Sequence, residues 1–569
     1  MKLNNFVRSK KGVFILNFII LVTYALSGCM KYEVSDDFVM EMMVSGAYTG
    51  KPSPFIMFMN PIIGILLSSL YNIFGKLNWY FLFHIAIIFL SLCVLTYYFF
   101  KWNTSNSNIL LVFIFLLFFT NDLYLLVQFT KTATLAISAG IVILLDSLIH
   151  NDKRKYTYIL GFFFFSIGYL IRENCIFIVA FFAMASFLLY LFKIKFNKQK
   201  IVLVIKNTMI LSIIGISLLL IFNIFNIQFN NNHPAYKKFQ NFNSYRASIV
   251  DYNYYSYEEN REEYEKNGIS ENDFYMLVHW NFGDIEYYDI DKLSTVSNIL
   301  EEYRDNQYVS IKGTIVNLIN REYKYYISFW GLIFISLINV ILNKKSLIIS
   351  FFIWSCTFLV LFINMYLGRL NYRVEFSVFL AAAIFSVFLS TSLINRFYNF
   401  KNKIIYFIIF IMIIGRIPIY IPNYENNYDI MFTSWNNDIR KYRTSFKKNF
   451  DYSVIDEIRS NPNNFYFLGF YSNIQTLYLN FDPLKDIATS FFDNSAFFAG
   501  VDTYNPVWLE HLKNNNIQNP MKSLLKENVY FIENRPINEV LKFIQEHYKK
   551  DAEMILYKQI GSYYVWKIR

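Results

Sequence analysis

Two adjacent aspartates follow the first long apolar segment of the chain, in the stretch KYEVSDDFVMEMMVSG that begins at Lys31. If this stretch is helical, Asp37 and Glu41 are four positions apart and share one face of the helix. A carboxylate that faces an aqueous groove can act as a general base, because it can take a proton from an attacking hydroxyl group. Ser35 or Asp36 would begin the helix as its N-cap, which makes Asp37 the preferred base.

The acid pair also has a structural alternative, in which Asp36 only caps the helix and stays solvated. We favour a functional site because the pair is held between two apolar segments. The same helix would turn Phe38 and Met42 toward the membrane. Asp36, Asp37 and Glu41 could also form part of a site for a hard divalent cation, but three carboxylates in sequence do not establish one. The metal requirement stays open, and the sequence indicates no other cofactor.

Basic residues recur near the ends of later apolar segments. Arginine binds phosphate through two parallel hydrogen bonds, and an ionisable group at membrane depth is a functional candidate by default. The alternative for each of them is snorkelling, or pairing with Glu173 or Glu375. His84 is a further candidate, although a lone histidine is more often packed and hydrogen-bonded. The residues that we expect to bind substrate, besides Glu41 and His84, are Lys131, Arg172, Arg369 and Arg373.

The composition is that of a membrane protein. The chain has 569 residues, of which 55% are hydrophobic and 20% aromatic, and its mean hydropathy is +0.29. Its net charge of +11 comes largely from lysine and arginine in short loops beside apolar segments, so we attribute it to membrane topology and not to nucleic-acid binding. The four cysteines all lie in or beside apolar segments, so disulfides do not hold the polar regions together.

About eleven apolar segments are long enough to cross roughly 30 Å of hydrocarbon. A further segment at 60–74 is shorter and opens with Asn-Pro, so we expect a juxtamembrane helix there. With the N-terminus in the cytoplasm and 60–74 not crossing, almost every basic loop is cytoplasmic, whereas a crossing at 60–74 would invert this pattern. The predicted spans are 13–30, 78–100, 108–127, 130–149, 156–172, 174–192, 201–227, 325–342, 346–366, 373–395 and 404–421.

This topology places three polar regions on the outer face: the loop 31–77, the stretch 228–324 and the tail 422–569. In the stretch 228–324 we expect several short amphipathic helices. The tail predicts a small α/β domain, with strands in NNFYFLGF and ENVYFI, a helix in INEVLKFIQEHYKK and a closing hairpin around Gly561. The sequence therefore predicts a polytopic helical membrane domain over 1–421 and an extracytoplasmic α/β domain over 422–569.

The order of a first span, an outward loop with an acid pair and juxtamembrane helices resembles the GT-C superfamily of membrane glycosyltransferases. This superfamily includes the protein O-mannosyltransferase-like and aminoarabinose-transferase-like enzymes. The segment KPSPFIMFMNPIIGILLSSLYNIFG, which begins at Lys51, resembles the family's proline-rich entry into its juxtamembrane helices. The motif-like region runs from about Ser35 to Gly75. The WWD-type signature of oligosaccharyltransferases is absent, which argues against N-glycosylation.

The resemblance implies an enzyme that moves a sugar from a polyprenyl-phosphate-linked donor to a glycan, lipid or protein acceptor of a bacterial cell envelope. The family's catalytic acid maps onto Asp36 or Asp37, and their adjacency does not decide between them. Two alternatives stay open. An envelope polysaccharide polymerase or ligase would place its essential residues in 228–324. A lipid-linked-oligosaccharide transporter or flippase would carry charged residues deep within its spans.

Overall fold

The computed structural model describes most of the chain, including the loop 31–77 and most of the C-terminal domain. Cys29 and most of the predicted span at 404–421 lie outside the described residues. The described residues are 2–27, 30–152, 154–252, 256–306, 310–321, 323, 326–394, 397–398, 401, 405, 408–409, 453–469, 481–484 and 492–569.

Within these residues, eight helices are long and apolar enough to cross a membrane. Each contains an apolar window of 18 residues with at most two charged side chains, the composition that hydrocarbon requires. Two further predicted spans, 156–172 and 325–342, form shorter apolar helices, and so does the segment 60–74. The eight long helices are α2 (Lys10–Ser27), α5 (Trp79–Lys101), α6 (Ser107–Leu125), α7 (Phe129–His150), α9 (Cys175–Lys193), α10 (Lys198–Asn232), α17 (Ser346–Tyr366) and α18 (Tyr372–Leu393), and the three short ones are α4 (Pro61–Ile73), α8 (Lys155–Ile171) and α16 (Ile327–Leu342).

The centre of the bundle consists of α6, α7 and α18, whose side chains are almost all buried. Glycines let α7 and α8 approach to backbone contact. A Cβ on Gly140 would lie 2.6 Å from the carbonyl oxygen of Gly161, and one on Gly168 would lie 2.7 Å from that of Ala133. Small residues at such crossings allow the close helix packing that is common in membranes.

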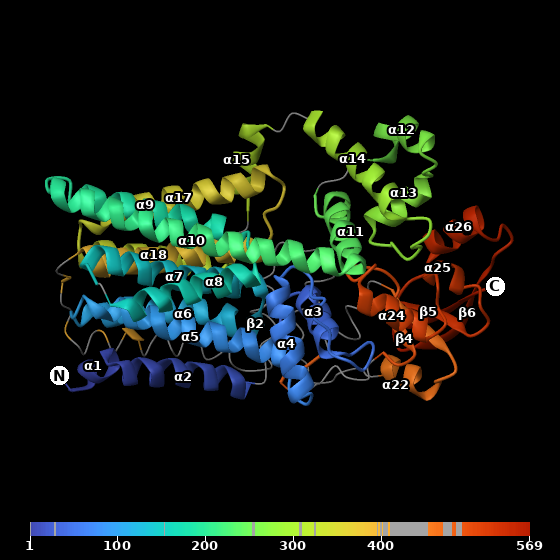
Figure 1. Ribbon diagram of the computed structural model, residues 1–569, viewed down its shortest axis with the longest axis horizontal. Helices are drawn as coiled ribbons and strands as arrows, with labels where there is room; N and C mark the ends of the chain where they lie inside the picture. The colour runs from blue at the N-terminus through green and yellow to red at the C-terminus, as the bar shows by residue number, and fades with distance from the viewer. Residues whose placement is uncertain are drawn as a thin grey trace.

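The helix α10 lies at the edge of the bundle and leaves most of its apolar side chains exposed. Its 35 residues make it about 52 Å long, which exceeds the thickness of the hydrocarbon. It carries the chain to α11 (Figure 1). The prediction of short helices in 228–324 is confirmed, because the described part of this stretch folds into α11 (Pro234–Val250), η1 (Tyr257–Asn260), α12 (Arg261–Lys266), α13 (Glu271–Val278), α14 (Ile290–Asn306) and α15 (Ile311–Ile319).

The C-terminal region is an α/β domain built on a five-stranded sheet in the order β4-β3-β5-β7-β6. The strands β4, β3 and β5 are parallel, and β7 and β6 add an antiparallel hairpin. Both predicted strands, the predicted helix and the hairpin around Gly561 are confirmed. The elements are α22 (Ser453–Ser460), β3 (Phe465–Leu468), β4 (Ser495–Phe497), α24 (Pro506–Asn514), α25 (Pro520–Ser523), β5 (Val529–Glu533), α26 (Asn538–His547), β6 (Met554–Ile560) and β7 (Tyr563–Ile568).

The loop 31–77 lies between the helix bundle and the C-terminal domain, and the N-terminus lies at the other end of the bundle, in the short helix α1 (Lys2–Arg8) (Figure 1). The loop begins with a two-residue strand, β1 (Lys31–Tyr32), which pairs in parallel with β2 (Leu126–Val127). Because β2 leads directly into α7, this pairing holds the start of the loop against the first turn of that helix.

Candidate functional site

The acid pair lies in the first turn of α3 (Ser35–Ser45). The prediction that Ser35 or Asp36 caps this helix is wrong, because the N-cap is Val34 and no side chain makes a cap hydrogen bond. The physical reason is the strand before it. The amide of Glu33 donates to the carbonyl of Val127 at 3.0 Å, so extended backbone continues up to the helix. Both aspartates therefore lie within the first turn, where the helix dipole favours negative charge.

The prediction that Phe38 and Met42 face the membrane is also wrong. Every residue of α3 from Asp37 to Ser45 is buried within the protein. The helix packs against α4 and α5, and the ring of Phe38 lies 5.1 Å from that of Phe481, which belongs to the C-terminal region. The helix that carries the acid pair is therefore enclosed by protein and not by lipid.

Asp37 is fully buried. Its Oδ1 atom accepts a hydrogen bond from the Tyr80 hydroxyl at 2.8 Å and one from the Phe129 amide at 3.1 Å. Its Oδ2 atom makes no hydrogen bond to any described residue. Burial raises the pKa of the Asp37 carboxyl well above its usual range. The Tyr80 hydrogen bond opposes this rise, and the Asp36 charge adds to it. A carboxylate with a raised pKa and an unused oxygen has the properties of a general base.

Asp36 lies on the more accessible side of the helix, with 21% of its side chain exposed. Its Oδ2 atom is 4.0 Å from the guanidinium of Arg373, which lies in the first turn of α18. The two aspartates therefore have different surroundings. Asp37 points into the protein toward Tyr80, and Asp36 faces a basic side chain.

Arg172 lies in the turn between α8 and α9 and is the second basic residue near Asp36. Its guanidinium stacks on the rings of Phe58 and Phe129, at 5.5 and 5.3 Å, and it forms no ion pair within the described part of the chain. Burial lowers the pKa of Arg172; the nearby Arg373 cation lowers it further, and the Asp36 carboxylate opposes this effect. A cation in this setting is stabilised by an incoming anion.

Phe58 and Phe129 connect the acidic and basic groups of the site. Their rings are stacked, with centroids 6.0 Å apart, and Phe129 also donates its amide to Asp37. Phe58 has a φ of 55°, a left-handed conformation that is strained for a residue with a bulky side chain. Strained backbone of this kind clusters at functional sites, where the surrounding structure enforces it.

Arg369 and Arg373 were both expected to bind substrate. Arg369 lies in the turn before α18 and already has a partner within the protein, because its guanidinium lies 3.0 Å from Oδ2 of Asp251 and over the ring of Tyr252. Asp251 also binds Arg246 at 3.0 Å, so the polar stretch 228–324 contributes an ion pair beside the site. Arg373 is therefore the member of the pair that lies nearer to the acids.

Lys131 is fully buried in a closed ion cluster. Its Nζ atom lies 2.7 Å from both Glu33 and Asp122, and Asp122 accepts the Tyr372 hydroxyl at 3.0 Å. This geometry argues against direct phosphate binding by Lys131. The cluster instead joins the start of the loop to α6, α7 and α18, and Tyr372 directly precedes Arg373. The roles of Glu33 and Tyr372 were not predicted, since their partners are distant in sequence.

Replacing Lys131 with methionine is expected to lower the free energy of unfolding by about 3–5 kcal/mol, because two buried carboxylates would lose their shared cation. Thermal unfolding in detergent micelles measures this loss. Lys198→Met, at an exposed position on α10, is the matched control. Equal unfolding temperatures for the two variants would contradict the assigned structural role.

Glu41 and His84 lie deeper in the same region. Glu41 is buried one turn after Asp37, and its carboxylate is the second cause, after burial, of the raised pKa of Tyr71 on α4. His84 is buried on α5, with its ring 4.7 Å from that of Tyr80, and neither ring nitrogen has a hydrogen bond to a described residue. Neither side chain reaches the exposed side of the site.

The acids of the first loop do not gather three ligand atoms for a metal ion. Among the described residues, such a set is formed by Asp273 on α13 with Glu546 and His547 on α26, away from the acid pair.

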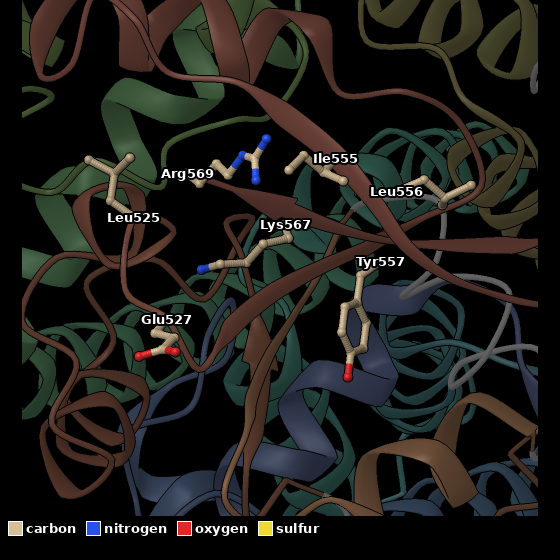
Figure 2. A pocket seen from close by; sticks show the side chains of 7 residues that line it. All are labelled: Leu525, Glu527, Ile555, Leu556, Tyr557, Lys567 and Arg569. Carbon is tan, nitrogen blue, oxygen red and sulfur yellow. The ribbon is translucent and has the colours of Figure 1, made fainter.

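A separate hollow of about 500 Å³ lies on the C-terminal domain beside the edge strand β6 (Figure 2). Its charged groups interact with neighbours in the same domain: Arg569 pairs with Glu553 at 3.2 Å, and Lys567 donates to the carbonyl of Val529 at 3.4 Å. We assign it no part in the acid site. The residues that line it are Leu525, Glu527, Ile555, Leu556, Tyr557, Lys567 and Arg569.

The fold and the composition define the class of the protein: a polytopic helical membrane protein with a C-terminal α/β domain. No protein-family model, curated protein or solved structure matches the chain.

Proposed function

We propose that this protein is a membrane glycosyltransferase that moves a sugar from a polyprenyl-phosphate-linked donor to a glycan, lipid or protein acceptor on the outer face of the cell envelope. One observation carries the proposal. Asp37, a buried carboxyl with an unused oxygen, lies next to Asp36, which faces Arg373, and Arg172 is close by. This arrangement offers a base and a phosphate-binding group on the two sides of one reaction centre.

In the proposed reaction, Oδ2 of Asp37 takes the proton from an acceptor hydroxyl as that oxygen attacks the anomeric carbon of the donor. The bond between the anomeric carbon and the phosphate oxygen breaks, and polyprenyl phosphate leaves with the electron pair. Arg172 and Arg373 stabilise the charge that develops on the phosphate. The product is the glycosylated acceptor, with Asp37 protonated until the proton passes to water.

The enclosure of Asp37 implies a movement during the reaction. Since its side chain is buried, an acceptor reaches Oδ2 only when the covering side chains shift. Loop movements that admit substrate and then exclude water are common in enzymes. The strained Phe58, which stacks on Phe129, is the residue of this loop that we expect to move.

The resemblance to the GT-C superfamily supports the same assignment, through the acid pair and the two helices α3 and α4 that follow it. An envelope polysaccharide polymerase or ligase is the second candidate, and the observation that favours it is the ion pair from Asp251 to Arg369. Analysis of the envelope glycans of a strain that lacks the gene tests the proposal. We expect one glycan to lose a single sugar residue, whereas loss of polymer length alone would favour the polymerase.

The proposed function requires that the acid site and the C-terminal domain lie outside the cytoplasm. We expect about eleven spans, a cytoplasmic N-terminus and α4 at the interface. Reporter fusions after Lys155 and Lys200 should be cytoplasmic, and one after Arg569 should be external. A cytoplasmic signal at Arg569, or an external signal at Lys200, would overturn this topology.

A further inference from the structure

The polar stretch and the C-terminal domain meet where α13 packs against α26. Asp273 lies in the first turn of α13 and is fully buried. His547 ends α26, and Glu546 directly precedes it. The Nε2 atom of His547 lies 2.8 Å from Oδ1 of Asp273, and one ligand atom from each of the three residues lies within 4.8 Å of the others.

Each of the three side chains is held in place by a neighbour. Oδ2 of Asp273 accepts hydrogen bonds from the Ser270 amide at 2.8 Å and the Tyr287 hydroxyl at 2.6 Å. Glu546 accepts from the Ser270 hydroxyl at 3.0 Å. The ring of His547 lies 4.2 Å from that of Tyr287. Outer partners of this kind orient the ligands of metal sites in proteins.

We propose that Asp273, Glu546 and His547 bind a Zn²⁺ ion that joins the polar stretch to the C-terminal domain. One imidazole nitrogen and two carboxylate oxygens are ligands that zinc accepts, and a water molecule completes a tetrahedral site. The two carboxylates balance the charge of the ion. Zinc would replace the hydrogen bond between His547 and Asp273, with the neutral imidazole offering its Nε2 lone pair.

The zinc ion would act as a cross-link between distant parts of the chain, since Asp273 and His547 are 274 positions apart. Figure 1 places α13 and α26 away from the helix bundle, beyond α3. The proposed ion therefore has a structural role and takes no part in sugar transfer. This inference stands independently of the proposed function.

Metal analysis of the purified full-length chain tests the site. The protein, freed of any affinity tag and treated with EDTA, is dialysed against ZnCl₂ and analysed for bound zinc, and its thermal unfolding is followed with and without the ion. We expect one zinc per chain and a higher unfolding temperature when zinc is present. In His547→Gln the zinc affinity should fall at least tenfold, and the zinc-dependent rise in unfolding temperature should disappear.

His279→Gln is the matched control, because His279 is the C-cap of α13 but is not one of the three proposed zinc ligands. Its ring is hydrogen-bonded to the carbonyl of Tyr275. It should bind zinc as the wild type does. Glu546→Gln, at an exposed position, tests the set without disturbing the buried Asp273. The proposal is overturned if the wild type holds no zinc, or if His547→Gln and Glu546→Gln both bind it with wild-type affinity.

Discussion

Replacing Asp37 with asparagine is expected to lower the rate of sugar transfer about a hundred- to ten-thousand-fold, the usual cost of losing a general base. Asparagine keeps the size of the side chain, and its amide oxygen can still accept from Tyr80 and Phe129, so the helix α3 should persist. It cannot take a proton from the acceptor. The rate is measured with purified protein at matched membrane insertion.

Asp36→Asn separates the roles of the two acids. Because Asp36 faces Arg373 and Asp37 does not, its loss should mainly weaken donor binding, which raises KM more than it lowers kcat. If both single variants transfer sugar at the wild-type rate, the acid pair is structural and the proposed reaction is wrong. If Asp36→Asn strongly lowers kcat and Asp37→Asn does not, the base is Asp36.

The raised pKa of Asp37 also predicts the pH dependence of the wild type. The base works only in its ionised form, so transfer should be high above its pKa and should fall as the pH drops through it. Because burial raises that pKa, the fall should occur well above the range of an ordinary aspartate. A rate that stays constant down to about pH 4 would show that no such group acts as the base.

Replacing Arg172 is expected to have the second large effect on the rate of sugar transfer. Its replacement with alanine should lower transfer about a hundred- to a thousand-fold, similar to the loss of one donor that stabilises charge in a transition state. The guanidinium has no ion-pair partner among the described residues and is already held by Phe58 and Phe129, so it is oriented before the donor binds.

Arg172→Lys keeps the charge but loses the planar fork and the stacking, so it should recover only part of the activity. Arg261→Ala, at an exposed position on α12, is the control and should transfer at the wild-type rate. Full activity in Arg172→Lys would show that charge alone matters there. Full activity in Arg172→Ala would remove this residue from the site.

The elements that carry strong local signals could be predicted from the sequence. Long apolar runs predict the spans, and short apolar strands beside a helix with regular spacing predict the C-terminal domain. The acid pair predicts a site at the start of α3. The capping prediction for Ser35 or Asp36 failed because the pairing of Glu33 with Val127 carries extended backbone up to Val34, where the helix begins. The partners of the Asp37 carboxylate, Tyr80 and Phe129, lie 43 and 92 positions away and also leave no local signal.

The contacts that define the site depend on tertiary structure and leave no local signal. Lys131 pairs with Glu33 and Asp122 because β1 lies beside β2. Arg369 pairs with Asp251, which lies 118 positions earlier in the chain. Phe38 is buried because the C-terminal region covers α3. No periodicity within one segment can show these contacts. The charged residues could therefore be identified as candidates from the sequence, but which of them have partners within the protein could not be predicted.

The most direct test of the proposed function is whether the purified protein cleaves a polyprenyl-phosphate-linked sugar. The wild type and Asp37→Asn are reconstituted in liposomes with a panel of polyprenyl-phosphate sugars and an envelope extract as the acceptor, and the release of free polyprenyl phosphate is measured. We predict that the wild type releases polyprenyl phosphate from at least one donor. Asp37→Asn should release it at a rate lower by at least about a hundredfold. Donors that all stay intact with the wild type, or equal release by the two proteins, would contradict the proposed glycosyltransferase.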